Sequence, residues 1–376
     1  MRAERTNAHK AGQFNLITWI QLAFAVAAVV LIVFAVNVAW GDIPRLSDGK
    51  PDLSGYYDTA TITPFERRGN SEEFLSSEQA EQNAAGREGW RARELQGSDP
   101  NREAPPAGGD GSGGAAGNVG GYNSFWVDPG ERNFEIDGKY PTSIIVDPPS
   151  GRVPPVTEAA RERFRAAFRS RPRGGDYGRQ NNGTAWWYPG PGPYDDPEIR
   201  PLPDRCLWGF GSTAGPPMLP TLYNNHKRIV QTPGHVMILT EMVHDARIVR
   251  MNGEHAPDDV RRWFGDSIGR WEDDTLVVET TNFTDRTNFG RGSTRDMRVV
   301  ERFSRIDGDT LLYNFTVEDP NVWETSFTGQ YTWRQTDEPV YEYACHEGNY
   351  SMFGILGGAR LMEREAMEKA AADSGD

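Results

Sequence analysis

The sequence of 376 residues contains few of the short motifs that identify enzyme classes. It has no phosphate-binding G-x-x-x-x-G-K-S/T loop, no H-E-x-x-H metal motif and no G-x-G-x-x-G that follows an expected strand. We also assign no hydrolase nucleophile motif to residues 265–269. The sequence therefore identifies neither a reaction nor a cofactor, and whether the protein is an enzyme stays open.

Hydrophobic residues are scarce, at 37% of the chain, whereas glycine and proline are abundant, at 41 and 26 residues. This composition favours many turns and long loops. Acidic residues outnumber basic ones, and the formal net charge is −14. Residues 1–40 carry three basic side chains and one acidic side chain, so the rest of the chain carries −16. Because phosphate binding requires a basic surface, we expect no nucleic-acid partner.

Only one stretch, residues 16–40, is apolar enough over a sufficient length to cross a membrane. It follows a basic flank, and on a helix Trp19 and Trp40 would lie about 30 Å apart, which matches the hydrocarbon thickness. Two interpretations fit: an uncleaved signal anchor, or a signal peptide cleaved near Ala39. Asn37 is a poor residue before such a cleavage site and favours the anchor. Either way we expect a periplasmic body, which the anchor would hold at the inner membrane.

Cysteine is almost absent, because the chain has only Cys206 and Cys345. In an oxidising compartment an even pair most simply forms one disulfide. Two separate buried thiols are the alternative, since cysteine packs well as a small apolar residue. Neither cysteine lies in a C-x-x-C motif, which disfavours a redox or metal role.

The most informative pattern in the sequence is a hairpin motif that occurs twice. Residues 274–281 and 309–316 both begin with Asp-Thr-Leu after an acidic turn and continue with β-branched or aromatic residues that suit a strand. Between residues 226 and 346 the pattern indicates roughly eight to nine strands. This density predicts a mainly antiparallel meander that forms a barrel or a sandwich.

We therefore predict an all-β protein with long Gly/Pro-rich loops, a few peripheral helices and one N-terminal transmembrane helix. The amphipathic pattern at 158–169, with Thr157 as a capping residue, predicts one of those helices. The expected divisions are the anchor or signal peptide at 1–40, a loop-rich region at 41–225 that wraps the core, an antiparallel β core at 226–346, and a terminal helix with an acidic tail at 347–376.

Three histidines adjoin a carboxylate in the sequence, and such pairs suit metal or acid–base sites because the acid orients the ring. We select His255, His346 and Glu347 as catalytic candidates, since turns and strand ends can present these side chains. Glu241 is another acid that could assist them. Neighbours on a strand point to opposite faces, so solvated or core-bonded histidines remain the alternative. We assign no metal ligands.

Aromatic side chains gather in loops that are rich in glycine, proline and asparagine. We select Tyr122, Trp126, Trp186 and Trp187 as ligand-binding candidates, because exposed aromatic platforms suit sugar rings or apolar small molecules. The alternative is that these rings plug the ends of a barrel or pin long loops onto it.

Several segments resemble a family of uncharacterised exported bacterial proteins. The resemblance runs from residue 43 to roughly residue 362 and implies export, but it implies no reaction. Members of that family look as if they carry ordinary signal peptides, whereas this N-terminus favours an anchor. The matching segments are residues 48–55, 118–126, 145–152, 214–220, 229–234, 271–283 and 341–350.

Three functions fit these observations. The first is a ligand-binding or accessory module of the cell envelope, with the ligand in the barrel mouth or against the aromatic loops. The second is a hydrolase or lyase that uses His255, His346 and a nearby acid. The third is a structural subunit of an envelope membrane complex. Convergence of both histidines and a carboxylate in one pocket would favour the enzyme.

Overall fold

The computed structural model describes residues 43–94, 101, 103, 127–169, 194–209, 215–285, 289 and 293–373. The expected membrane segment at 16–40 and the aromatic candidates Tyr122, Trp126, Trp186 and Trp187 lie outside these residues, so they stay predictions. Within the described ranges, no helix combines the length and the apolar character needed to span a bilayer.

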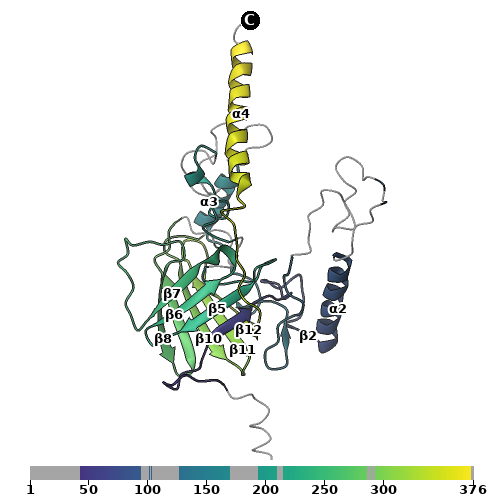
Figure 1. Ribbon diagram of the computed structural model, residues 1–376, viewed down its shortest axis with the longest axis vertical. Coiled ribbons are helices and arrows are strands. Elements are labelled where there is room, and N and C mark those ends of the chain that lie inside the picture. The colour runs from purple at the N-terminus through teal and green to yellow at the C-terminus, as the bar shows by residue number, and fades with distance from the viewer. Residues whose placement is uncertain are drawn as a thin grey trace, which may run out of the picture.

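Nine strands form a closed barrel, which confirms the predicted β core and selects the barrel over the sandwich (Figure 1). The ring closes because β1 pairs with both β5 and β12. Neighbouring strands are antiparallel except β7 and β8, which run parallel. The barrel strands are β1 (Gly55–Asp58), β5 (His226–Gln231), β6 (His235–Thr240), β7 (Ala246–Met251), β8 (Asp266–Glu272), β9 (Thr275–Thr281), β10 (Arg298–Arg305), β11 (Thr310–Glu318) and β12 (Phe327–Thr336).

Inward and outward side chains alternate along each strand, as closure into a small barrel requires. On β11 the inward residues Leu311, Tyr313, Phe315 and Val317 are all fully buried. The ring of Tyr313 lies 4.8 Å from that of Trp333 on the neighbouring strand β12, measured between centroids. Aromatic side chains therefore fill much of the barrel interior and bury a large apolar area.

The repeated hairpin is confirmed. Asp273 in the β8–β9 turn has a φ of +50°, and the β10–β11 turn spans residues 306–309. Asn252 also adopts a turn conformation, with a φ of +54°, but no hairpin follows it. Residues 252–265 instead return along the outside of the barrel, which makes β8 parallel to β7.

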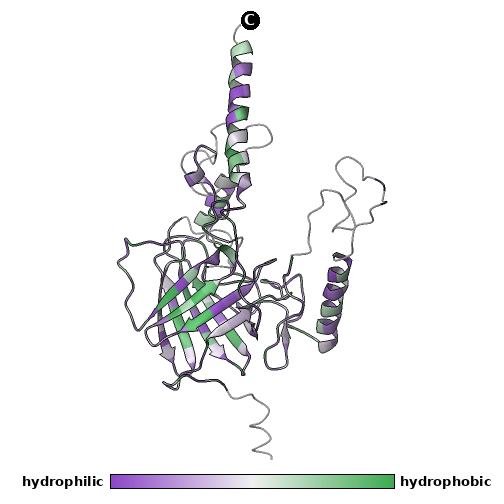
Figure 2. Cartoon of the chain, in the orientation of Figure 1, coloured by the Kyte–Doolittle hydropathy of each residue, from purple (hydrophilic) through white to green (hydrophobic). Residues whose placement is uncertain are grey.

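The barrel is not completed by the expected core alone, because β1 comes from the region that we expected to wrap it. The predicted helix at 158–169 is present, and its Ala160 N–H donates to Thr157 Oγ1 at 3.1 Å. Figure 2 shows that α2 is mostly polar, whereas apolar residues are frequent on the barrel strands. The other elements are β2 (Phe74–Leu75), β3 (Tyr140–Pro141), β4 (Ile145–Asp147), α2 (Ser77–Glu94), α3 (Glu158–Arg169), η1 (Pro197–Ile199), η2 (Met242–His244) and α4 (Tyr350–Asp373).

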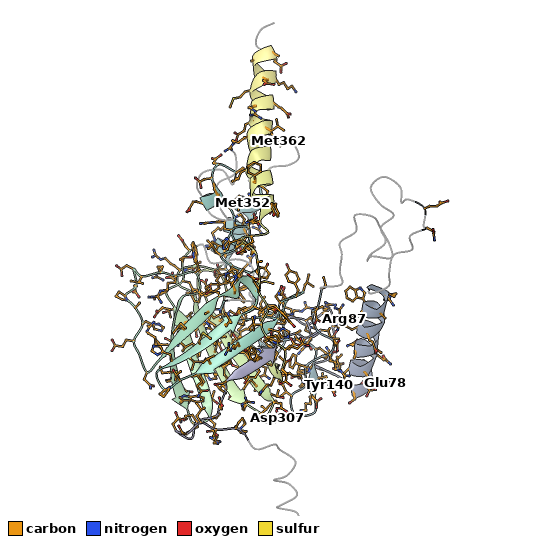
Figure 3. The ribbon with its side chains drawn as sticks, viewed as in Figure 1. Glu78, Arg87, Tyr140, Asp307, Met352 and Met362 are labelled. Atoms are coloured by element: carbon orange, nitrogen blue, oxygen red, sulfur yellow. A yellow bond between two sulfur atoms is a disulfide. The ribbon has the colours of Figure 1, made fainter. Side chains whose placement is uncertain are left out.

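The two ends of the barrel differ, and we name them as they stand in Figure 1. The lower end carries the turns between β5 and β6, β8 and β9, and β10 and β11. The upper end carries η2 and the base of α4. There the Cys206–Cys345 disulfide, with its Cα atoms 5.8 Å apart, confirms the predicted pairing. Figure 3 shows Met352 and Met362 on α4 above the barrel and Asp307 at the opposite end.

Candidate functional site

His255 lies on the outer wall of the barrel, in the connection between β7 and β8. Its Nδ1 is 3.1 Å from Asp266 Oδ2, and its Nε2 is 3.4 Å from Glu279 Oε1. Fully buried Asp266 also accepts two hydrogen bonds from Arg250, both at 2.8 Å, and one from the Ala256 N–H at 3.0 Å. These contacts, above all those from Arg250, hold the pKa of Asp266 far below its usual range.

We call these side chains the outer cluster. Its second carboxylate, Glu279, pairs with Arg298, and this contact lowers the pKa of Glu279. Each carboxylate thus has a cationic partner, and the cluster fastens residues 252–265 to the barrel wall. This arrangement fits the core-bonded alternative for His255. The outer cluster consists of Arg250, His255, Asp266, Glu279 and Arg298.

His346 and Glu347 lie elsewhere, directly after Cys345 at the base of α4, and both are exposed. Within the described chain, no hydrogen bond or ion pair joins either of them to His255. The structure therefore gives no support to a site shared by His255, His346 and Glu347. Nor do the described residues include a group of three or more His, Cys, Asp and Glu side chains that could hold a metal ion.

Residues 265–269 read Gly-Asp-Ser-Ile-Gly and do have the Gly-x-Ser-x-Gly spacing of a hydrolase nucleophile motif, so our interpretation of that segment was wrong on the spacing. The structure nevertheless excludes a nucleophile elbow there. Ser267 lies within β8 rather than at a turn from a strand into a helix. Its hydroxyl is buried inside the barrel, 2.8 Å from Thr280 Oγ1.

A second set of polar side chains lies inside the barrel at its upper end. The strand register brings them together, because they are the second residues of β5, β7 and β8, the last residue of β6 and the penultimate residue of β9. Glu301 and Tyr313 join them from β10 and β11. All are at least nine-tenths buried. This inner cluster consists of Lys227, Thr240, Arg247, Ser267, Thr280, Glu301 and Tyr313.

Arg247 and Glu301 form the centre of the inner cluster. The guanidinium of Arg247 donates from Nη2 to Glu301 Oε1 at 2.9 Å and from Nη1 to Glu301 Oε2. The Tyr313 hydroxyl donates to Glu301 Oε1 at 2.7 Å. Burial raises the pKa of Tyr313, so this hydroxyl keeps its proton. Both oxygens of Glu301 are therefore already occupied.

Lys227 is fully buried, and burial lowers its pKa to about 7. The charges of Glu241 and Asp58 act in the opposite direction and favour the protonated amine. Glu241 is itself buried, and its Oε2 accepts the His226 N–H at 3.2 Å. Glu241, the acid that the sequence suggested as an assistant for His255, thus lies near Lys227 at the upper end instead.

Met218 contacts the inner cluster from a segment outside the barrel strands. The Met218 N–H donates to the Tyr313 hydroxyl at 2.9 Å, and the Tyr331 hydroxyl donates to the Met218 carbonyl at 2.9 Å. The Met218 sulfur lies 3.8 Å from Arg247 Nη2, and the residue is fully buried. Met218 therefore acts as a plug over the cluster.

The inner cluster was missed because no local motif marks it. A signal does exist at the inward positions of the strands, where an ionisable residue alternates with apolar ones. Lys227 stands two residues before Ile229, Arg247 two before Val249, and Glu301 two before Phe303. A charge at such a position is buried whenever the sheet closes into a barrel.

The fold and the inner cluster define a class of protein, namely a closed nine-stranded β-barrel with a buried cluster of polar and ionisable side chains at its upper end. Comparisons of the chain with protein-family models, with curated proteins and with solved structures each found no match. The resemblance to an exported bacterial family stays a prediction. Since a barrel fold alone implies no function, the inner cluster carries the functional inference.

Proposed function

We propose that the protein is an exported, membrane-tethered β-barrel that binds a small molecule at its upper end, with the inner cluster as the binding site. The supporting observation is the burial of three ionisable side chains, Lys227, Arg247 and Glu301, inside one end of the barrel. Removing a charged group from water costs several kcal/mol, even after the protein relaxes around it. Barrel mouths are also a common place for small-molecule sites.

The rest of the interior indicates that closure of the barrel does not require such a cluster. Tyr57, Phe303 and Trp333 are fully buried and pack against one another as rings, with Phe303 and Trp333 centroids 5.6 Å apart. Apolar residues of similar volume often replace a buried ion pair without loss of stability. The inner cluster lowers the stability of the fold and could be replaced by apolar residues, so it is a candidate for a functional role.

The proposed membrane tether would leave the upper end of the barrel accessible to ligands. The described chain begins beside the lower end, where Arg45 pairs with Asp274 at 2.6 Å and Lys50 Nζ donates to the Asp273 carbonyl at 3.1 Å. A membrane anchor at 16–40 would join the body at that end. The upper end and the inner cluster would then face away from the membrane, into the periplasm.

The proposal is tested by ligand screening with the full-length protein in nanodiscs. Thermal shifts are measured against a chemically diverse panel of small molecules, and compounds that co-purify are identified by mass spectrometry. We expect at least one compound to raise the melting temperature of the wild type. Lys227→Met should reduce that shift, because it removes a polar group from the cluster.

The matched control is Arg228→Met, the next residue on the same strand. Its side chain is exposed on the outer wall, so this variant should respond as the wild type does. The proposal fails when no compound shifts the wild type, or when Lys227→Met and Arg228→Met respond equally.

One observation favours the enzyme as the second candidate. The Lys227 amine, with a pKa lowered to about 7, lies in a region that also holds Glu241 and His226, whose Nδ1 is 3.5 Å from Glu241 Oε2. An amine that titrates near neutral pH suits proton transfer. If any ligand from the screen is turned over, loss of turnover in Lys227→Met with binding retained would select the enzyme over the binding module.

A further inference from the structure

We infer that the ligand is a small carboxylate, which accepts a hydrogen bond from Arg247 Nε and displaces Met218 from the upper end of the barrel. This inference rests on the proposed function and names the chemistry of its ligand. It follows from three observations: an unused hydrogen-bond donor, the charges inside the cluster, and the nature of the plug.

The unused donor is Arg247 Nε. The two terminal nitrogens of this guanidinium are bonded to Glu301, and Nη1 also approaches Thr280 Oγ1 at 3.4 Å. The Nε–H, although buried, has no hydrogen-bond partner among the described residues. A buried donor without an acceptor costs about 1–3 kcal/mol, so an acceptor oxygen supplied from outside would be bound favourably.

Each neighbouring acceptor already takes part in at least one hydrogen bond, and none of them accepts from Nε. Glu301 uses both oxygens, and the Tyr313 hydroxyl accepts from Met218 while it donates to Glu301. The hydroxyls of Ser267 and Thr280 are paired with each other at 2.8 Å. Arg247 Nε is therefore a buried donor that the surrounding described side chains leave without an acceptor.

Charge selects an anion from among possible acceptors. Inside the cluster, Lys227 and Arg247 are the basic groups and Glu301 is the carboxylate, which Arg247 already binds. The charges of buried Glu241 and of Asp58 favour protonated Lys227, and burial raises the pKa of Asp58. The other titratable groups that face this region are His226, Tyr313 and Tyr331. A carboxylate therefore complements the free donor of Arg247 and lies close to a second basic group, Lys227.

The plug explains how a ligand could enter. Met218 is unbranched, and methionine adapts readily to irregular space, so its side chain can repack when a ligand enters. Its segment is held at the cluster by two hydrogen bonds between main-chain atoms and tyrosine hydroxyls. A carboxylate that enters would take the place of the Met218 sulfur beside the Arg247 guanidinium.

Binding of a carboxylate should couple to protonation of Lys227. Above neutral pH the buried amine has partly lost its proton, and a nearby anion would favour its return. Ligand binding should therefore take up a proton, and affinity should weaken as pH rises from 7.5 to 9.5, by at most about tenfold per pH unit. A neutral ligand would show no such dependence.

The test uses the full-length protein in nanodiscs and calorimetric titration with acetate, benzoate, benzyl alcohol and benzylamine. Benzoate and the two neutral or cationic analogues share a ring that can pack on the interior aromatic side chains. We expect benzoate to bind at least tenfold more tightly than benzyl alcohol or benzylamine, with proton uptake at pH 8 when buffers of different ionisation enthalpy are compared.

Two variants locate the site. Arg247→Lys keeps a cation for Glu301 but removes the Nε–H, and should weaken benzoate binding at least tenfold. Lys227→Met should remove the proton uptake, whereas Arg228→Met should change neither property. Lys227→Met keeps the test conclusive should Arg247→Lys fold poorly.

Two failures are distinguishable. If neutral or cationic compounds bind at the upper end and neither carboxylate does, the inference on ligand chemistry is overturned while the binding module stands. If neither these probes nor the diverse panel binds, the proposed function fails with it. Carboxylate binding that is unchanged in both Arg247→Lys and Lys227→Met would overturn the assignment of the site.

Discussion

The outer and inner clusters both contain ion pairs and one buried nitrogen without a hydrogen-bond partner, His255 Nε2 and Arg247 Nε, yet they differ in burial. Arg250 and Arg298 of the outer cluster keep 33% and 39% of their side-chain surface exposed, whereas the cations of the inner cluster are more than nine-tenths buried. In the outer cluster, Asp266 accepts from two arginine nitrogens, a histidine and a main-chain N–H. In the inner cluster, the Arg247 Nε–H lacks an acceptor among the described residues, and burial disfavours the charge of Lys227. The first pattern fits a structural fastening, and the second fits the ligand site that we propose.

The largest effect expected from this comparison is on the outer cluster. Asp266→Asn removes the charge that several donors share, and should lower the free energy of unfolding by about 3–5 kcal/mol. The folded-state pKa of Asp266 lies below its ordinary value of 3.8, so the contribution is complete above that pH and is lost as pH falls below it. Chemical denaturation of the wild type and of the variant at pH 7 and pH 3 measures the loss of stability and its dependence on pH. Asp259→Asn, exposed in the same connection, is the control; equal stability of the two variants would contradict a fastening role.

Shortening the side chain of Met218 should lower the stability of the protein but raise its affinity for benzoate. Met218→Ala leaves both main-chain hydrogen bonds intact but empties a buried volume, and should destabilise the protein by about 2–5 kcal/mol. The same change should tighten benzoate binding at least threefold, since less side chain has to be displaced. Calorimetry of this variant beside Met237→Ala, on the outer face of β6, measures the difference. Weaker binding in Met218→Ala would mean that Met218 belongs to the site rather than covering it.

Lys227→Met should stabilise the protein by about 1–4 kcal/mol, because it removes a buried ionisable group. Burial lowers the folded-state pKa to about 7 from an ordinary 10.5, so between these values the unfolded chain binds more protons. Wild-type stability should therefore rise between pH 7 and pH 9 by an amount that the variant lacks. Denaturation curves at both pH values, with Arg228→Met as control, check the sign. A destabilised Lys227→Met would indicate a structural role.

His255→Gln should have the smallest effect. It removes one of several contacts to Asp266, and a loss of about 0.5–1.5 kcal/mol is expected, with ligand binding unchanged. The exposed His235→Gln variant on the β5–β6 hairpin is the comparison. Loss of ligand binding or of a discovered activity in His255→Gln alone would restore His255 as a site residue.

Much of the fold could be predicted from local sequence. Alternation of apolar residues on β10, β11 and β12, together with the acidic turns before Thr275 and Thr310, determines antiparallel hairpins. The pairing of Cys206 with Cys345 was predicted from the presence of only two cysteines and from the oxidising compartment that we expected. Ring closure could not be predicted, because β1 has four residues and pairs with strands far away in sequence.

The candidate site was harder to predict for the same physical reason. His255 beside Glu254 is visible as a sequence neighbour, but its contacts are with Asp266 and Glu279, which the parallel β7–β8 crossing brings near. Arg247 and Glu301 are 54 residues apart and meet only across the closed barrel. Local pattern therefore indicates which residues form strands, whereas barrel closure decides which charges meet.

The most direct test of the inner cluster is the structure of the full-length protein determined in the presence of benzoate. A ligand site predicts the carboxylate within hydrogen-bond distance of Arg247 Nε, with Met218 moved away from the guanidinium. Unchanged positions of Met218 and Arg247, with benzoate bound on the outer wall or nowhere, would contradict it.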